Sequence, residues 1–240
     1  MNKPGNGITR NSPVRQPVLL GLFTGTAVGV GYLLFSLPNV ELMTLVVALA
    51  GGTLGPRAGF LVGAMSASIY SLGSPLGLPH PLLLAAQAVG MGLAGRIGHW
   101  GAGFVSRFQG NRRRALAIGS AAVTGLLATT GNGILTNLAA MPAFDLSFPV
   151  VFYPAIPFFL LRGAVNTLVF GILFPPLLMR LAPLRRARLA GGSTGGVILA
   201  ACFLLLMAGG GTALAQEAES VEVPVARPDS IVAADPGTVQ

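Results

Sequence analysis

Cysteine, charged residues and aromatic residues are all scarce in this chain. Its 240 residues include a single cysteine, which excludes an internal disulfide framework and any metal site built from clustered cysteines. Charged residues make up 9% of the sequence, whereas soluble domains usually contain about a quarter. So small a share of charge argues against a soluble globular protein.

Apolar residues and glycine are abundant instead. Apolar residues make up 52% of the chain, and most of its 34 glycines lie inside apolar stretches rather than between them. Small residues inside apolar helices let helix backbones approach closely in a lipid bilayer. The length suits one membrane domain of about six or seven spans. The sequence therefore predicts an all-α integral membrane protein.

The formal net charge of +8 would also fit a nucleic-acid-binding protein, so the placement of the basic residues matters. They cluster at alternate junctions between apolar segments: Lys3, Arg10 and Arg15; Arg107, Arg112, Arg113 and Arg114; Arg180, Arg185, Arg186 and Arg188. This is the positive-inside pattern of membrane proteins. A nucleic-acid interface would gather such residues on one polar surface, and none is visible. We therefore expect a multi-pass protein of the cell (inner) membrane, with a cytoplasmic amino terminus and no nucleic-acid partner.

Apolar segments separated by glycine- and proline-rich turns predict a six-helix transmembrane bundle. Five of the predicted helices cover about Pro17–Leu37, Glu41–Ala50, Pro81–Ile97 with an extension toward Phe104, Ala115–Leu138 and Ala155–Leu181. The remaining helix, third in order, follows a glycine-proline turn at 51–57 and reaches about Leu72. The second and third are short for a full crossing, so we expect them to be tilted, bent or sheltered by their neighbours.

The chain divides into four predicted regions. Residues 1–16 form a cytoplasmic segment, 17–189 the six-helix domain, 190–212 an additional apolar segment and 213–240 a disordered, acidic, extracytoplasmic tail. The additional segment has a basic flank and a short apolar core, and Ala-Leu-Ala follows it at 213–215, which is the layout of a secretory signal. Two interpretations stay open: a seventh span, or an internal junction that is cleaved.

No pattern of catalytic or metal-binding residues is present. His80 and His99 are the only histidines, and the predicted topology places them near opposite membrane faces, so they cannot share a metal ion. The sequence contains no Gly-x-Ser-x-Gly, no His-Glu-x-x-His and no phosphate-binding loop ending in Lys-Ser or Lys-Thr. We therefore expect no enzyme activity, no metal site and no cofactor.

The most unusual polar residue is Arg162, which lies in an apolar helix four residues before Asn166. That spacing places both side chains on one helical face. An arginine near the outer end of the sixth predicted helix costs about 3 kcal/mol in lipid and should face a partner or a wet cavity. Two interpretations stay open: an arginine that binds a ligand, or one that snorkels to the outer headgroups.

Other polar residues are predicted at the same outer depth, at the outer ends of several helices. Asn132 and Thr136 belong to this group. Together the polar residues predict a pocket open to the outside. We select as its substrate-binding residues Asn39, Glu41, His80, Gln87, Asn137, Arg162 and Asn166. The nearest tyrosines, Tyr70 and Tyr153, give little indication of a flat ring in the ligand.

The first predicted helix carries small residues at four-residue spacing, Gly25 with Gly29 and Ala27 with Gly31. Such spacing makes a smooth face for a partner helix in lipid. Packing inside the bundle explains the same spacing equally well.

Several motifs, taken in order, resemble the S components of energy-coupling factor (ECF) transporters over about Val18 to Leu181. The motifs are LPNVE at 37–41, GGTLGPRAGFLVG at 51–63, SPLG at 74–77, PHP at 79–81 with Gln87, LTNL at 135–138 and RGAVNTLVF at 162–170. The resemblance implies a membrane subunit that binds a vitamin-like nutrient from outside, such as cobalamin or riboflavin. It also implies association with a transmembrane coupling subunit, here through Ala27 and Gly31, and with ATPase subunits that supply the energy. The apolar segment after residue 189 departs from the six-helix pattern.

A membrane assembly or scaffold protein is the alternative function, because polar residues also join helices to one another in lipid. A saturable ligand that copurifies with the protein, or that raises its thermal stability, would separate the two functions.

Overall fold

The computed structural model describes residues 15–35, 42–74, 77–108 and 113–189. Within these ranges all regular structure is helical. The helices are α1 (Arg15–Leu33), α2 (Leu42–Leu54), α3 (Pro56–Leu72), α4 (Pro81–Arg107), α5 (Arg114–Ala143), α6 (Phe148–Arg180) and α7 (Ala182–Leu189). Helices α1, α4, α5 and α6 are long and apolar enough to cross a membrane. The prediction of an all-helical membrane protein is confirmed. The count of six crossings stays a prediction, because α2 and α3 have 13 and 17 residues.

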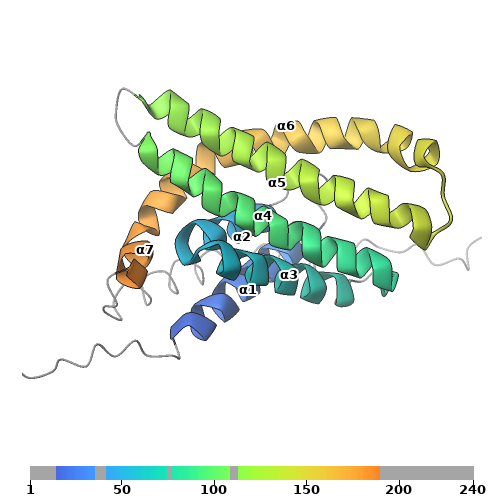
Figure 1. Ribbon diagram of the computed structural model, residues 1–240, viewed down its shortest axis with the longest axis horizontal. Coiled ribbons are helices and arrows are strands. Elements are labelled where there is room, and N and C mark those ends of the chain that lie inside the picture. The colour runs from blue at the N-terminus through green and yellow to red at the C-terminus, as the bar shows by residue number, and fades with distance from the viewer. Residues whose placement is uncertain (1–14, 36–41, 75–76, 109–112, 190–240) are drawn as a thin grey trace, which may run out of the picture.

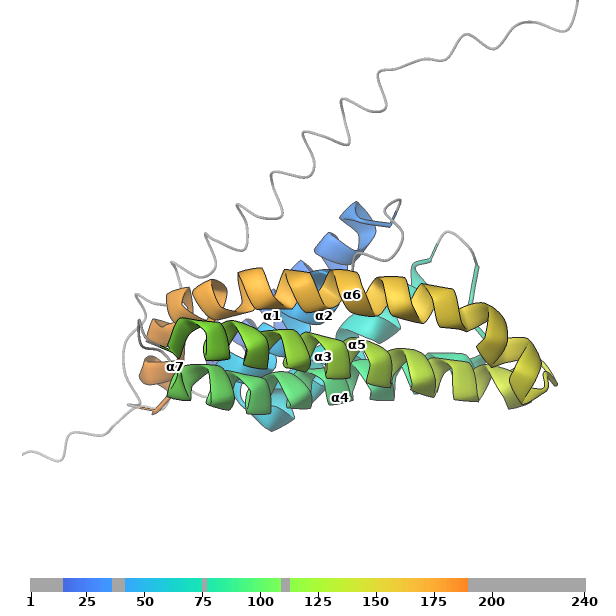
Figure 2. The same cartoon turned by 90° about the horizontal axis from the view of Figure 1, so that it is seen from above.

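Helix α4 is the central long helix of the bundle. It packs against α5 on one side and against α2 and α3 on the other, and α5 in turn packs against α6. Helix α1 packs against α2 and α3 (Figure 1 and Figure 2). The short α7 turns away from the end of α6 and lies across the end of the bundle, where it contacts α2 (Figure 1).

Helix α2 is the most enclosed element. All of its residues except Leu42 and Val46 are buried. A helix that is apolar on every side is stable only when other helices surround it, and α2 contacts α1, α3, α4, α5 and α6. The expectation that neighbours shelter this short helix is therefore confirmed.

Glycines allow α2, α3 and α4 to pack backbone against backbone. A Cβ atom on Gly51 would collide with the carbonyl oxygen of Gly95, and a Cβ atom on Gly59 would collide with Gly51. Any larger residue at these positions would push the helices apart, so the abundance of glycine in apolar stretches serves helix packing here.

Prolines account for the largest differences between predicted and observed helix ends. Helix α6 begins at Phe148 rather than at about Ala155, because Pro149 occupies its first turn, where the missing N–H is harmless. Four further prolines lie inside α6: Pro154, Pro157, Pro175 and Pro176. Membrane helices tolerate internal prolines when local adjustments and neighbouring groups satisfy the freed carbonyl groups. Helix α5 likewise continues past its predicted end, to Ala143.

The two ends of the bundle differ in charge. Arg107 ends α4, Arg114 begins α5 and Arg180 ends α6, and we call this the arginine end. Asp145, the only acidic residue in the described ranges, lies between α5 and α6 at the opposite end. The predicted apolar segment at 190–212 and the acidic tail at 213–240 lie outside the described residues, so both interpretations of that segment stay predictions.

Candidate ligand pocket

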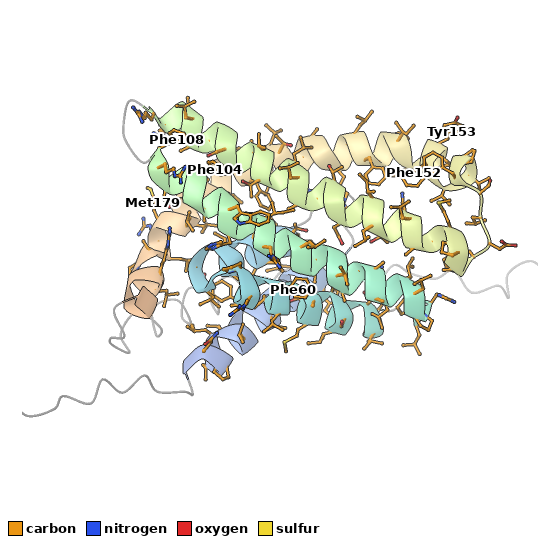
Figure 3. All side chains as sticks on the ribbon, in the orientation of Figure 1. Phe60, Phe104, Phe108, Phe152, Tyr153 and Met179 are labelled. Carbon is orange, nitrogen blue, oxygen red and sulfur yellow. The ribbon has the colours of Figure 1, made fainter. Side chains whose placement is uncertain are left out.

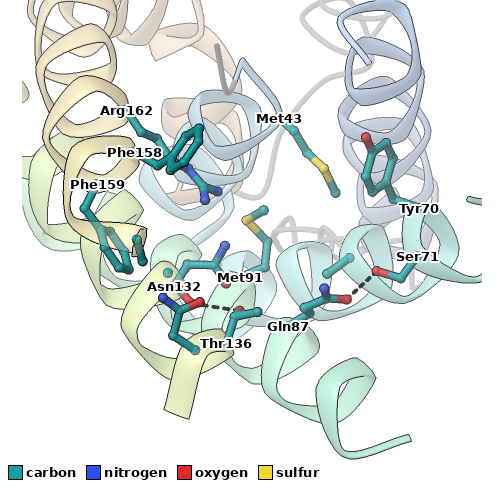
Figure 4. A pocket seen from close by; sticks show the side chains of 14 residues that line it. Met43, Tyr70, Ser71, Gln87, Met91, Asn132, Thr136, Phe158, Phe159 and Arg162 are labelled. Atoms are coloured by element: carbon teal, nitrogen blue, oxygen red, sulfur yellow. Dashed lines mark hydrogen bonds between the residues drawn. The ribbon is translucent and has the colours of Figure 1, made fainter. Parts of the chain in front are cut away.

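A pocket of about 440 Å³ lies between α2, α3, α4, α5 and α6. Its lining residues are Met43, Ala67, Tyr70, Ser71, Gln87, Met91, Asn132, Gly133, Thr136, Asn137, Ala155, Phe158, Phe159 and Arg162. Figure 4 shows their side chains converging on one space from separate helices. Small-molecule sites in proteins usually measure about 300–1,000 Å³, so this pocket has the size of a ligand site.

Amide and hydroxyl groups enter the pocket from α3, α4 and α5. Ser71 donates its Oγ–H to Oε1 of Gln87 over 2.6 Å, which leaves the two N–H groups of that amide for another acceptor (Figure 4). On α5, Thr136 donates to the backbone carbonyl oxygen of Asn132 over 2.9 Å. The side-chain oxygen of Asn132 is buried and accepts no hydrogen bond from the described residues. A polar ligand would meet amide and hydroxyl groups here.

Aromatic and sulfur-containing side chains cover the remaining walls. They are Met43, Met91, Tyr70, Phe158 and Phe159 (Figure 4). The sequence indicated few aromatic residues near the pocket, but three line it: Tyr70, Phe158 and Phe159. The spacing in the sequence contained a signal for two of these residues, because Phe158 and Phe159 precede Arg162 by four and three positions and so share its helical face.

Arg162 carries the only charge among the described lining residues. Its guanidinium group lies beside Phe158 and points into the pocket (Figure 4). Because α6 begins at Phe148, Arg162 lies about 21 Å along the 33-residue helix, at 1.5 Å per residue. The predicted position near the outer end of the helix is wrong, since it assumed a later helix start. At mid-helix depth a wet cavity is a better environment for a guanidinium group than lipid.

Three of the seven predicted substrate-binding residues come together in this pocket: Gln87, Asn137 and Arg162. No histidine and no carboxylate is among the described lining residues. Within the described ranges, no group of three or more His, Cys, Asp or Glu side chains could hold a metal ion.

The other four predicted residues are placed differently. Asn166 is fully buried outside the pocket lining, and its Nδ2 donates to the backbone carbonyl oxygen of Arg162 over 3.0 Å. His80 is exposed at the start of α4, where its ring nitrogen accepts a hydrogen bond from the backbone of the first turn. Asn39 and Glu41 lie outside the described residues.

The two predicted coupling residues of α1 face the interior of the bundle. Ala27 is fully buried, and a Cβ atom on Gly31 would lie 3.1 Å from the ring of Tyr70. In this structure both residues therefore pack internally, which is the alternative that their spacing left open. The other face of α1 carries exposed glycines at which an added Cβ atom would meet nothing within 4 Å: Gly21, Gly25 and Gly29.

Comparison with known proteins identifies a family. A family model described as "ECF transporter, substrate-specific component" matches residues 15–174, which is 160 of the 240 residues. The matched segment includes every residue that lines the pocket. No curated protein and no solved structure matches the chain.

Proposed function

The chain belongs to the family of substrate-specific components of ECF transporters, and on this premise we propose that it binds a small vitamin-like nutrient in the pocket that Arg162 lines. Membership makes it a substrate-binding membrane subunit that works with a coupling subunit and ATPase subunits in a lipid bilayer, rather than an enzyme. The observation that carries the proposal for the site is the convergence of Arg162 with amide and hydroxyl groups from three other helices.

The charge of the lining favours a ligand with an anionic or acceptor-rich group. Arg162 supplies a planar fork of N–H donors that suits a carboxylate or phosphate. Gln87 and Asn137 add neutral amides, and no described lining residue carries a negative charge. A cationic ligand would therefore meet repulsion at Arg162 without a compensating carboxylate in the described lining.

The apolar walls favour a ligand that also has a flat or conjugated part. Tyr70 and Phe159 provide ring faces, and Met91 provides a polarizable sulfur atom that packs well against rings. A volume of about 440 Å³ suits a molecule of the size of a flavin, whereas a corrinoid would extend beyond the pocket. Of the two vitamin classes implied by the resemblance, the smaller fits this pocket better.

Release of the nutrient requires contact with the coupling subunit, and we place that contact on the exposed face of α1. Its glycines, Gly21, Gly25 and Gly29, leave a smooth surface on which a partner helix can pack closely. The opposite face of α1 touches the pocket, because Gly31 lies against both Tyr70 and Met43. A shift of α1 on docking would therefore move two walls of the pocket.

Identification of the bound molecule tests the proposal. The protein should be purified in mild detergent, and its small-molecule content should be identified by mass spectrometry without a preselected target. The expected result is one acceptor-rich organic molecule at near-stoichiometric amount that raises the midpoint of thermal unfolding when added back. Absence of any saturable ligand would instead favour the membrane scaffold function.

A further inference from the structure

A second hollow lies at the arginine end of the bundle, between α4 and α7. It measures about 360 Å³ and is lined by His99, Trp100, Gly103, Phe104, Arg107 and Arg185. We call it the α4–α7 groove. It shares no residue with the pocket that Arg162 lines. Figure 3 shows Phe104 near the end of α4 that adjoins α7. The groove therefore needs its own explanation.

The groove changes from aromatic to cationic along the axis of α4. Trp100, Phe104 and Arg107 follow at intervals of four and three residues, so they share one helical face. The two aromatic side chains are 57% and 51% exposed, although they are large and apolar. A face of this kind is stable when it lies against lipid, with the apolar rings toward the hydrocarbon and the arginine toward the headgroups.

The length of α4 puts these residues at the matching depths. Its 27 residues extend about 40 Å, which equals the thickness of a bilayer including its headgroups. Arg107, the last residue of α4, then lies at headgroup depth. Trp100 lies about 10 Å closer to the bilayer centre, near the boundary of the hydrocarbon, where tryptophan is enriched in membrane proteins.

Two arginines from different helices meet at the headgroup end of the groove. The Arg185 side chain reaches from α7 to α4, where its Nη1 donates to Oγ of Ser106 over 3.0 Å. The guanidinium carbon of Arg107 lies 5.7 Å from the centre of the Phe104 ring. Asp145, the only acidic residue in the described ranges, is at the other end of the bundle. The described residues thus leave this pair of positive charges without a carboxylate nearby.

Gly103 keeps the groove open. It lies between Trp100 and Phe104 on α4, and an added Cβ atom there would meet nothing within 4 Å. This contrasts with Gly95 and Gly98 on the same helix, where a Cβ atom would collide with the backbone of a neighbouring helix. Gly103 therefore creates space beside the aromatic rings rather than a helix contact.

We propose that the α4–α7 groove is a binding site for an anionic phospholipid. Arg107 and Arg185 bind the phosphate of the headgroup, and the glycerol and upper acyl chain lie over Gly103 between Trp100 and Phe104. Basic pockets between membrane helices are known to favour anionic headgroups. The aromatic part of the groove selects a lipid over a free phosphate ion, since a free ion would leave that surface uncovered. The bound lipid would also bridge α4 and α7.

The fluorescence of Trp100 reports on this groove directly, because it is the only tryptophan in the chain. The full-length protein is reconstituted into phosphatidylcholine vesicles that contain increasing fractions of phosphatidylglycerol with brominated acyl chains, and quenching is recorded. A parallel series uses brominated phosphatidylcholine. Each basic side chain near an anionic lipid raises the affinity for that lipid by a factor of about five. Half-maximal quenching should therefore need a roughly five- to twentyfold lower fraction of brominated phosphatidylglycerol than of brominated phosphatidylcholine.

Variants separate the groove from general attraction to an anionic surface. Arg107→Gln and Arg185→Gln should each lower the preference by about fivefold, and the double variant should abolish it. Gly103→Leu keeps both arginines but fills the groove, so it should also lower the preference. This variant tests the groove if the double variant does not fold. Arg57→Gln removes an exposed charge from α3, outside the groove, and should leave the preference unchanged.

Three results would overturn the proposal. Equal quenching of the wild type by both lipids would show that the groove does not distinguish headgroups. A preference that persists in the double variant, or in Gly103→Leu, would place the anionic lipid elsewhere. Loss of the preference on adding inorganic phosphate, but not on adding sodium chloride of equal ionic strength, would identify a free phosphate site instead of a lipid site.

Discussion

The side-chain N–H of Asn166 donates to the backbone carbonyl oxygen of Arg162, four residues earlier on α6, over 3.0 Å. Arg162 points into the pocket, whereas Asn166 is fully buried beside it. The two residues share a helical face as the sequence indicated, but we propose that they differ in role. Arg162 would contact a ligand, whereas Asn166 would support the turn of α6 that carries Arg162.

Replacement of Asn166 by alanine tests that division of roles. Asn166→Ala should lower the free energy of unfolding by about 1–3 kcal/mol, because it removes a buried amide together with its hydrogen bonds. Asn137→Ala, a change of the same type in the pocket lining, should lower ligand affinity with little effect on unfolding. Unfolding midpoints and ligand dissociation constants measure the two effects. If Asn166→Ala lowered affinity at unchanged stability, Asn166 would contact the ligand after all.

Two glycines on opposite faces of α1 should give opposite phenotypes. Gly31→Leu places a side chain against Tyr70 and Met43, so it should disturb the pocket and weaken ligand binding by roughly five- to 150-fold, through overpacking of about 1–3 kcal/mol. Gly25→Leu meets nothing within the chain, so folding and binding should be preserved while uptake with the complete transporter is lost. Normal uptake by Gly25→Leu would exclude this face of α1 from the coupling contact.

Two glycines of α4 should differ in their effect on stability. Gly95→Ala should destabilise the protein by about 1–3 kcal/mol, because the new methyl group collides with the backbone of Gly59. Gly103→Ala meets open space and should be neutral or stabilising by up to about 1 kcal/mol, since alanine favours helix over glycine. The measurement is thermal or denaturant unfolding followed by circular dichroism. Equal stability of the two variants would contradict the close approach of α3 and α4.

The proposed orientation can be tested by thiol labelling in intact cells after Cys202 is replaced by serine. Cysteines at Gly77 or Ala143 should react with a membrane-impermeant maleimide, because the Asp145 end is proposed to face outward. Cysteines at Arg113 or Arg186 should react only after the membrane is permeabilised, because basic clusters remain in the cytoplasm. Labelling at Arg113 but not at Gly77 in intact cells would reverse the orientation.

Much of the helical pattern could be predicted from the sequence, because local signals determine it. The end of α3 at Leu72 was predicted, because Gly73 begins a glycine- and proline-rich loop. The turn predicted at 51–57 is wrong in extent, since α2 continues to Leu54 and α3 begins at Pro56. The start of α6 was missed because Pro149 and Pro154, which precede the predicted start at Ala155, are typical of loops in sequence. In lipid, a helix is so strongly favoured over other backbone conformations that it continues through them.

The polar part of the pocket was easier to predict than its walls. Arg162 and Gln87 stand out because polar residues are rare in apolar helices. Phe159 and Met91 resemble any other apolar residue, so only three-dimensional packing identifies them as pocket walls. The burial of Ala27 could not be predicted for the same reason, since small and apolar residues occur on every side of α1 and the sequence marks no face as internal.

The affinity of Arg162→Lys for the copurifying ligand tests the central claim most directly. Lysine keeps the charge but loses the planar fork of donors, so affinity should fall by roughly ten- to a hundredfold, equivalent to about 1.5–3 kcal/mol. Arg96→Lys, the same change at an exposed arginine of α4 outside the pocket lining, serves as the control and should bind like the wild type. The account predicts weaker binding by a folded Arg162→Lys protein. Equal affinity in Arg162→Lys and wild type would contradict it.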